Sequence, residues 1–381
     1  MSDMITVNDF ISAGPDTLAG KYLRRFWQPV YCAHEILPGH AVPIRVMGEN
    51  FTLYRGEEGT PHVVADRCAH RGTQLSVGWI EGDSIRCFYH GWKYDGSGQC
   101  IEQPAEPKPF ANNIRIASYP VRESLGLIFA YLGDGEPPPF NRFARFEDPA
   151  YVVDAIRFDR TCNYYNNIEN SLDTTHVRFV HNRHRESVRD RIVTGDPVVS
   201  VEEIEWGVRR YARYPDGKEA VFFFGMPNIS YINGQVVDAD VKRVDSLIFK
   251  VPVDDDRHLH FEARMMPFSG EKGLKWLENR RAQRAKDDID RLDLVRDVLA
   301  GKLRLDDIDP GRTDHVLIED EVAQTGQGAI ANRGREHLGR GDLGIVLLRK
   351  LWERELRALS EGRALKQWTY KPEMVPVYPS A

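Results

Sequence analysis

Two short segments of the chain each combine a cysteine with a histidine. Cys68 and His70 stand in the first segment and Cys87 and His90 in the second, which gives the pattern C-x-H-x16-C-x2-H. Two thiolates with two imidazoles suit either tetrahedral zinc or a [2Fe–2S] cluster whose two irons are ligated unequally. Zinc fingers usually pair Cys with Cys and His with His along the chain, whereas each segment here supplies one of each. The spacing therefore favours the cluster over structural zinc.

The residues around these four candidates point the same way. Gly72 and Gly91 follow the two pairs, so the backbone can approach inorganic sulfide closely. The segments CAHRG and CFYHGWKYDGSGQC resemble the Rieske signature. This resemblance implies that Trp92 and Tyr94 pack beneath the cluster. A Rieske cluster accepts and passes on an electron but makes no bonds, so the rest of the chain must use that electron.

A second group of residues follows the pattern D-x2-H-x4-H, with Asp173, His176 and His181. On a regular helix the two histidines would differ by about 140° in direction, so a distortion or a helix end near Phe179 is needed. Taken alone, they are more simply two histidines on a helix surface. The segment 166–181 is, however, similar to the mononuclear iron motif of Rieske oxygenases. The resemblance implies that both histidines bind iron and that the aspartate links this site to a cluster.

An Fe(II) site that activates O2 needs a third, anionic ligand beside its two histidines. Asp320 is the preferred candidate, because its neighbours on the same helical face are apolar or weakly polar and an unpaired charge there would be costly. These neighbours are Val316, Ala323 and Gln327. The stretch 318–339 also resembles the part of the family that holds the carboxylate ligand. Glu319 and Glu321 are the alternatives.

The elements that must position these residues fall into three parts. Residues 1–40 have the apolar spacing of a helical lead-in, and residues 41–140 contain short alternating runs separated by Gly, Asp and Asn, as in a small antiparallel β domain. The predicted strands are 42–46, 50–54, 62–65 and 84–87. The stretch 133–139 ends in three prolines, which cannot continue a strand or helix, and marks the domain boundary.

The third part, residues 141–381, is predicted to be the catalytic domain. Its strand candidates are 221–231, 247–251 and 258–266, and its helix candidates are 162–181, 271–300 and 342–360. Strands in the middle with helices around them predict an α+β domain with an antiparallel sheet. The fold class is thus an all-β Rieske domain followed by an α+β domain. The aromatic run 222–229 could line a substrate cavity, but such a strand is more often ordinary core.

Composition excludes several classes of protein. The net charge of −6 gives no electrostatic reason to bind nucleic acid or an anionic membrane. The apolar runs are much shorter than the roughly 20 residues that span a bilayer, and the N-terminus lacks the pattern of a secretory signal. Five cysteines, an odd number, argue against a disulfide framework and for a reduced compartment. We expect a cytoplasmic protein.

The overall texture resembles the phthalate-dioxygenase-like, α-subunit-only group of Rieske oxygenases. This implies a homo-oligomer, a trimer or a dimer of trimers, assembled head to tail so that the cluster of one subunit serves the iron of the next. Asp173 would then bridge His176 and a cluster histidine, His90, of the partner subunit. The sequence shows no plant-type ferredoxin cysteines and no G-x-G-x-x-G fingerprint that follows a strand, so electrons must come from a separate ferredoxin, reductase or both.

The resemblance implies O-demethylation of a methoxylated, lignin-derived aromatic acid, of which dehydrodivanillate is an example, with release of formaldehyde. The alternative is cis-dihydroxylation of an aromatic carboxylate of the phthalate type. Outside the oxygenases, a Rieske electron carrier or a zinc-stabilised binding protein would share the first motif. An acidic substrate favours an arginine that clamps its carboxylate, but the sequence does not select one.

Overall fold

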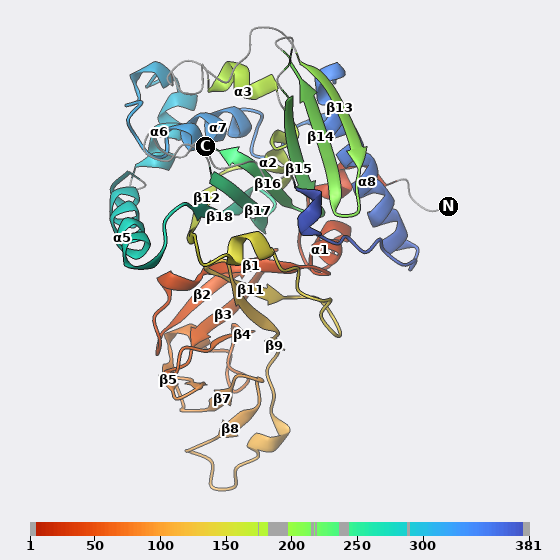
Figure 1. The fold of residues 1–381 in the computed structure, drawn as a ribbon. Coiled ribbons are helices and arrows are strands. Elements are labelled where there is room, and N and C mark those ends of the chain that lie inside the picture. Colours follow the sequence, from red (N-terminus) through yellow and green to blue (C-terminus); the bar gives the residue numbers. More distant parts are fainter. Residues whose placement is uncertain are drawn as a thin grey trace.

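Short antiparallel strands form the lower part of the molecule (Figure 1). The computed structural model describes residues 5–173, 175–181, 197–214, 217, 219–235, 244–287 and 290–375. Two four-stranded sheets have the orders β2–β3–β4–β9 and β5–β6–β7–β8. Their strands are β2 (Ala41–Val46), β3 (Glu49–Arg55), β4 (Pro61–Ala65), β5 (Trp79–Glu81), β6 (Ser84–Arg86), β7 (Lys93–Asp95), β8 (Cys100–Glu102) and β9 (Ser118–Tyr119). The four strands predicted here are confirmed, and so is the all-β class of this part.

A small core of its own joins the two loops that carry the cysteines. Leu75 and Ile85 are fully buried in it, together with Tyr94, and Cys68 and Cys87 are members of the same cluster of buried side chains. Two single turns of 3-10 helix, η3 (Leu75–Val77) and η4 (Ala111–Asn113), lie in this part. Burial of a few apolar side chains thus fixes the positions of both loops.

The first forty residues are only partly helical. Their helical turns are η1 (Val7–Phe10), α1 (Leu18–Leu23) and η2 (Ala33–Glu35). Where the sequence predicted a helical lead-in, Trp27–Cys32 instead form a strand, β1. This strand pairs with β11 (Leu127–Tyr131), which also pairs with β10 (Val121–Ser124). Pro29 disfavours a helix interior, and it is tolerated in β1 because this is an edge strand with a register shift beside the proline.

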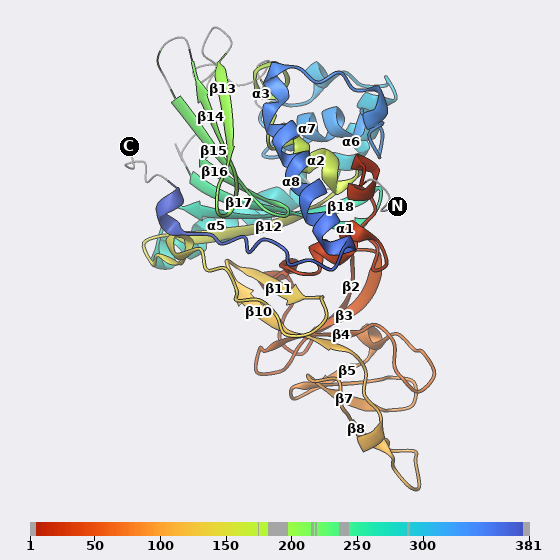
Figure 2. The same ribbon diagram turned by 90° about the vertical axis from the view of Figure 1, so that its right-hand side faces the viewer.

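A seven-stranded antiparallel sheet is the centre of the upper part (Figures 1 and 2). Its order is β12–β18–β17–β16–β15–β14–β13. The strands are β12 (Val152–Arg160), β13 (Val198–Glu203), β14 (Gly207–Arg213), β15 (Glu219–Gly225), β16 (Ile229–Gln235), β17 (Val244–Asp254) and β18 (Arg257–Met266). The candidates 247–251 and 258–266 are confirmed within β17 and β18. The candidate 221–231 is corrected to a hairpin, because residues 226–228 form a turn around Pro227.

Helices cover one face of this large sheet (Figure 2). They are α2 (Tyr164–Asn170), α3 (Thr175–Val180), α5 (Gly270–Asp287), α6 (Arg291–Leu299), α7 (His315–Thr325) and α8 (Leu343–Ser360). Elsewhere in this part lie the 3-10 turns η5 (Ala144–Glu147), η6 (Leu305–Asp307), η7 (Arg333–Arg335), η8 (Arg340–Asp342) and η9 (Pro372–Met374). The α+β class is therefore confirmed. None of the helices that the structure describes has the length and apolarity needed to cross a membrane.

Two of the predicted helices are each divided in two. The candidate 162–181 ends at Asn170 and resumes at Thr175 as α3. Asp173 explains this break, because its carboxylate accepts the backbone N–H of Thr175 at 2.7 Å and so caps a new helix. The candidate 271–300 similarly consists of α5 and α6, whereas 342–360 is confirmed as α8.

The opposite face of the large sheet packs against the sheet that contains β1 and β11. The ring of Phe249 on β17 lies 5.5 Å from that of Phe129 on β11, centroid to centroid. One continuous hydrophobic core extends from Phe10 through both sheets to Val375. The upper and lower parts of the molecule are therefore joined by apolar packing as well as by the chain.

A buried ion pair fixes α7 to the large sheet. Arg160, at the end of β12, places its Nε 2.5 Å from Oε2 of Glu321 on α7, and both side chains are at most 1% exposed. The other oxygen of Glu321 accepts hydrogen bonds from the backbone N–H and the hydroxyl of Thr161, at 2.5 and 2.7 Å. Removing one partner of such a pair leaves a buried charge uncompensated.

We predict that Glu321→Gln lowers the free energy of unfolding by about 3–5 kcal/mol, because Arg160 keeps its charge and loses its partner. Urea unfolding followed by tryptophan fluorescence measures this loss. The matched control is Glu219→Gln, which breaks the exposed pair with Arg213 and should cost about 1 kcal/mol or less. Equal, small losses in the two variants would contradict the role given to Glu321.

Candidate functional site

The first site is formed by two loops of the lower part. Cys68 and His70 lie after β4, and Cys87 and His90 lie between β6 and β7. Each loop closes on its own cysteine: the N–H of Gly72 donates to the Cys68 carbonyl at 2.9 Å, and that of Gly91 to the Cys87 carbonyl at 3.0 Å. These tight turns need a positive φ, which is +73° and +75° at the two glycines.

The structure brings the four predicted ligands together by type. The two cysteines are free thiols, 3% and 2% exposed, and they interact with each other: burial and the neighbouring Cys68 raise the pKa of Cys87. The rings of His70 and His90 lie 4.5 Å apart. The Nδ1 atom of His70 is buried, with no hydrogen-bond partner among the described residues. This donor set fits a cluster with two sulfur and two nitrogen ligands.

Two aromatic residues that the resemblance singled out, Trp92 and Tyr94, contact the candidate ligand loops. The Trp92 ring stacks on His70 with centroids 4.6 Å apart and planes 7° apart. The Tyr94 hydroxyl lies 3.2 Å from Sγ of Cys68 and accepts the N–H of Ala69 at the same distance. Contacts of this kind orient ligands and tune their electronic properties.

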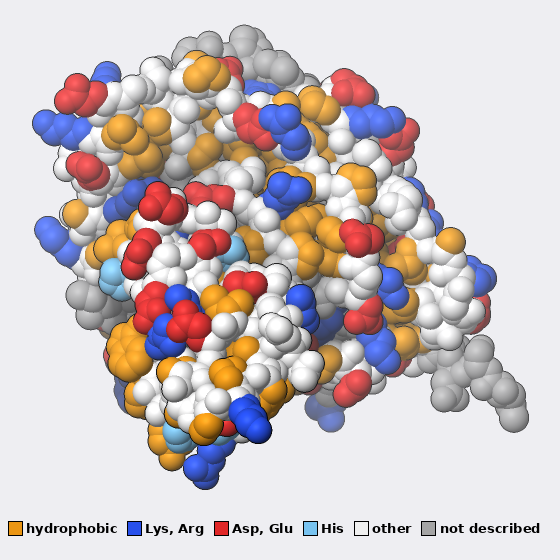
Figure 3. Space-filling view, turned by 90° about the horizontal axis from the view of Figure 1, so that it is seen from below, with side chains coloured by type: hydrophobic (Ala, Val, Ile, Leu, Met, Phe, Trp, Pro, Cys, Tyr) orange, Lys and Arg blue, Asp and Glu red, His pale blue; other side chains and the backbone are white. Residues whose placement is uncertain are grey.

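The surface beside this site is partly apolar. Phe88 and Tyr89, between the second cysteine and histidine, are 49% and 52% exposed. Seen from below, hydrophobic side chains lie among acidic, basic and histidine side chains at this end of the molecule (Figure 3). The site is thus at an accessible tip and not in the molecular interior.

The second site lies between α3 and α7. His176 is on α3, His181 follows the last residue of that helix, and Asp320 is on α7. One ligand atom from each of the three lies within 4.8 Å of the other two. Nε2 of His176 and of His181 lie 3.7 and 3.3 Å from Oδ1 of Asp320. Ligand atoms about 2.1 Å from one metal ion would be about 3 Å apart, so small movements would let the three residues bind iron.

The helix end required by the D-x2-H-x4-H spacing is present. α3 stops at Val180, and the N–H of His181 still donates to the Val177 carbonyl at 3.3 Å. His181 can therefore turn back towards His176 although a regular helix would separate them. Their ring centroids are 5.5 Å apart.

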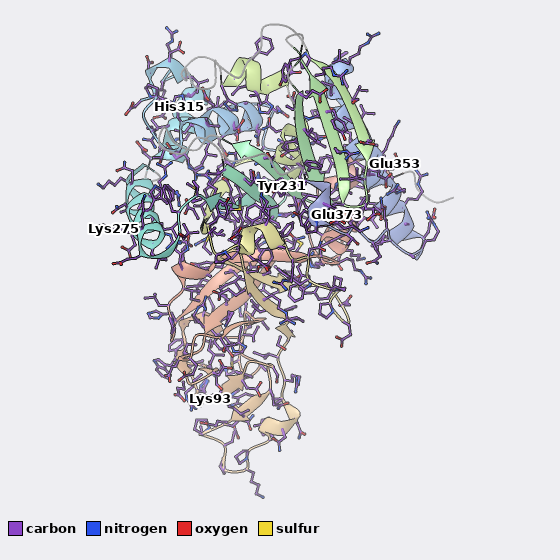
Figure 4. The ribbon with its side chains drawn as sticks, viewed as in Figure 1. Lys93, Tyr231, Lys275, His315, Glu353 and Glu373 are labelled. Carbon is purple, nitrogen blue, oxygen red and sulfur yellow. The ribbon has the colours of Figure 1, made fainter. Side chains whose placement is uncertain are left out.

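Glu319 and Glu321, the alternatives to Asp320, point elsewhere. Glu319 lies 2.9 Å from Nδ1 of His181 and 3.4 Å from Nε2 of His315, the latter within the helical layer (Figure 4). Glu321 is held by Arg160. Of the three consecutive carboxylates, only Asp320 faces the Nε2 atoms of both histidines, and Glu319 orients His181 from its other nitrogen.

The charges of this site reinforce one another. Burial lowers the pKa of His181, but the acceptors Asp320 and Glu319 outweigh burial and raise it to about 9. Burial raises the pKa of Asp320, but His181, with His176 and Arg160, lowers it well below its ordinary value. A divalent cation placed here would replace the proton of His181 as the partner of the carboxylate.

Asp173 contacts His176 from the side away from Asp320. Its Oδ2 lies 3.6 Å from Nδ1 of His176, and its Oδ1 accepts the N–H of Thr175 and of His176. Burial raises the pKa of Asp173. The hydrogen bond and the charge of His176 lower it by more, so that the net shift of the pKa is downward. Asp173 is thus both a helix cap and a neighbour of the histidine.

Sequence reasoning missed several charged residues that the helix-covered face of the large sheet buries. Arg160, Arg210, Lys250 and Glu262 are each at most 8% exposed. In Arg257–Met266, every second residue from 258 to 264 is a histidine or a charged residue and the others are apolar. This alternation in the sequence could have predicted a buried polar layer on one face of the strand. Phe223 and Phe224, proposed as cavity-lining or core residues, are 1% and 0% exposed and belong to the core.

The two sites lie at opposite ends of the molecule. Figures 1 and 2 both show α3 and α7 in the upper part and β5 to β8 at the bottom, with β1, β11 and β2 to β4 between them.

Comparisons with known proteins find a known domain family around the first site and relatives along most of the chain. The model of the Rieske [2Fe-2S] domain family matches residues 26–120. The chain is 28% identical to the 5,5'-dehydrodivanillate O-demethylase oxygenase subunit of Sphingobium sp. (strain NBRC 103272 / SYK-6), over 92% of this chain and 79% of that protein. It is 29% identical to the phenoxybenzoate dioxygenase subunit alpha of Ectopseudomonas oleovorans, over 91% and 83%.

A solved structure with the same fold is the oxygenase in the reduced complex between oxygenase and ferredoxin in carbazole 1,9a-dioxygenase. The TM-score is 0.64 with 22% identity, over 90% of this chain and 93% of that one. The cofactors of these relatives are a Rieske [2Fe–2S] cluster and a non-haem Fe²⁺ centre. The chain thus carries a Rieske domain and is homologous along most of its length to oxygenase subunits of Rieske non-haem iron oxygenases.

Proposed function

We propose that the two sites hold the two metal centres of this family. The residues proposed for the [2Fe–2S] cluster are Cys68, His70, Cys87 and His90, and those proposed for Fe²⁺ are His176, His181 and Asp320. The observation that carries the proposal is the convergence of these last three side chains from two helices in a chain that also contains a Rieske domain. The iron would supply O2 activation, and the protein orients its ligands through Asp173 and Glu319.

We further propose that the substrate is a methoxylated aromatic acid of the lignin-derived type, which is O-demethylated with release of formaldehyde. Support comes from the O-demethylase subunit among the relatives. Because the phenoxybenzoate relative is named a dioxygenase, cis-dihydroxylation of an aromatic carboxylate is the second candidate. The electron-carrier and zinc-protein interpretations find no support among these relatives, which are oxygenase subunits.

Electrons would come from a separate ferredoxin, reductase or both, as the ferredoxin in the matched complex suggests. We propose a homo-oligomer, a trimer or a dimer of trimers, in which Asp173 bridges His176 and His90 of the partner subunit. The distance between the two sites of one subunit supports this arrangement, because a cluster at the tip is far from the iron site of its own subunit (Figure 1).

The metal assignment predicts about three irons and two acid-labile sulfides per chain. We expect His176→Ala to lose about one iron while the EPR signal of the reduced cluster persists, and His70→Ala to lose that signal. Iron and sulfide analysis with EPR measures both changes. His337→Ala, at an exposed histidine, is the matched control and should keep every iron. Zinc without sulfide, or an unchanged iron content in His176→Ala, would contradict the assignment.

Iron binding should depend on pH, because His181 must lose its proton to become a ligand. With a pKa of about 9 in the metal-free protein, we expect the affinity for Fe²⁺ to rise by up to about tenfold per pH unit between pH 6.5 and 9 and then to level off. Anaerobic Fe²⁺ titration of the protein lacking this iron measures the effect. Glu319→Gln removes one acceptor and should move the levelling-off to lower pH. An affinity that is constant over this range would be the contrary result.

The product distinguishes O-demethylation from cis-dihydroxylation. With an electron donor and O2, we expect a methoxylated benzoate to give formaldehyde and the corresponding phenol in equal amounts, as shown by derivatised formaldehyde and chromatography. A cis-diol in place of formaldehyde would establish the second candidate. His176→Ala serves as the control for product formed without the iron site.

A further inference from the structure

Two buried basic side chains, those of Arg210 and Lys250, share the helix-covered face of the large sheet. On this face, Arg210 of β14 is paired across the strands with Phe222 of β15, and Lys250 of β17 donates a hydrogen bond to Ser230 of β16. Phe224 lies between them, with its ring 5.8 Å from Nζ of Lys250. Aromatic rings thus lie beside both Arg210 and Lys250, on the face that α2, α3 and α7 cover (Figure 2).

Two nitrogen atoms of the Arg210 side chain have no hydrogen-bond partner among the described residues. The residue is 8% exposed, yet its Nε and Nη1 atoms are buried without a hydrogen-bond acceptor among the residues that the structure describes. Its guanidinium carbon lies 5.1 Å from the centre of the Phe222 ring, a cation–π contact that uses a face of the guanidinium and none of its N–H groups. Buried donors are almost always paired in proteins, so these two N–H groups are available to an acceptor that a ligand would bring.

Arg210 and the proposed iron ligand His176 share a charged neighbour. Asp173 attracts both Arg210 and His176 electrostatically. Lys250 similarly interacts with Asp320, but burial lowers the pKa of its amine far below the ordinary value, so a charge on it is costly. Burial lowers the pKa of Arg210 only to about 10, against the attraction of Tyr214 and Asp173, so Arg210 stays charged at neutral pH. Of these two buried side chains, Arg210 is the one suited to a permanent anion.

We propose that Arg210 binds the carboxylate of the aromatic substrate, with Phe222 beneath its guanidinium, and thereby selects acids over neutral aromatic compounds. A guanidinium offers two parallel N–H groups that match the two oxygens of a carboxylate. The inference rests on the proposed iron site, because it places the substrate beside His176. The substrate anion would supply the hydrogen-bond acceptors that this side chain lacks.

The test compares an acid with its uncharged isostere. Binding of 4-methoxybenzoate and of 4-methoxybenzamide to the anaerobic, iron-loaded protein is measured by calorimetry for the wild type, Arg210→Met and Arg209→Met. The last is the matched control, since Arg209 is the neighbouring residue on β14, points to the opposite face and pairs with Glu202. We expect Arg210→Met to weaken acid binding by about 10- to 100-fold and amide binding by less than about threefold. Arg209→Met should bind both as the wild type does.

Stability separates a binding role from a structural one. If Arg210 waits for a ligand, Arg210→Met removes an unpaired buried charge and should raise the urea midpoint of the substrate-free protein. A lowered midpoint, or acid binding equal to that of the wild type, would overturn the proposal. So would a wild type that binds the amide as tightly as the acid.

The outcome is also distinguishable from failure of the proposed reaction. Arg210-dependent binding of the acid without formaldehyde would uphold this inference and reject demethylation. Formaldehyde from neutral methoxylated compounds, unaffected by Arg210→Met, would uphold demethylation and reject this inference.

Discussion

The buried pair between Arg160 and Glu321 is the contact on which the geometry of the iron site depends. Successive residues of a helix point about 100° apart, so three consecutive carboxylates on α7 must face three directions. Once Glu321 is held against β12, Glu319 faces His181 and His315, and Asp320 faces both candidate iron ligands of α3. A rotation of α7 by one residue would bury a carboxylate against no partner. The ion pair thus selects one orientation of the helix among several that would bury similar apolar area.

The same logic applies on the side of α3. Asp173 ends the break after α2 by capping α3, and it also contacts the ring of His176. One side chain therefore sets both where the helix begins and how the histidine is turned. In the lower part of the molecule the two loops owe their positions to a small apolar core and to two glycines, and not to buried charge.

Much of both sites could be predicted from the sequence because their ligands are local in the chain. Cys68 with His70, and Cys87 with His90, are held by single turns, so spacing alone predicts them. The step from His176 to Asp320 spans more than a hundred residues, and only resemblance and the apolar face of α7 connected them. Arg210 could not be selected from the sequence. It stands out because two of its nitrogen atoms have no acceptor among the described residues, and this depends on which side chains the neighbouring strands and the helical layer place around it. The strand β1 was missed because local helical periodicity was outweighed by pairing with the distant strand β11. The hairpin of β15 and β16 was missed because the turn around Pro227 was not recognised within an apolar run.

The two sites lie at opposite ends of the folded subunit, and this affects how the protein behaves when it is diluted. Electron tunnelling weakens steeply with distance, so an isolated chain could be fully loaded with metal and still leave its own iron without a source of electrons. Turnover would then follow the concentration of assembled subunits and not the concentration of cofactor. In such a protein the equilibrium between chains, and not the chemistry at either metal, would set the lowest concentration at which the enzyme works.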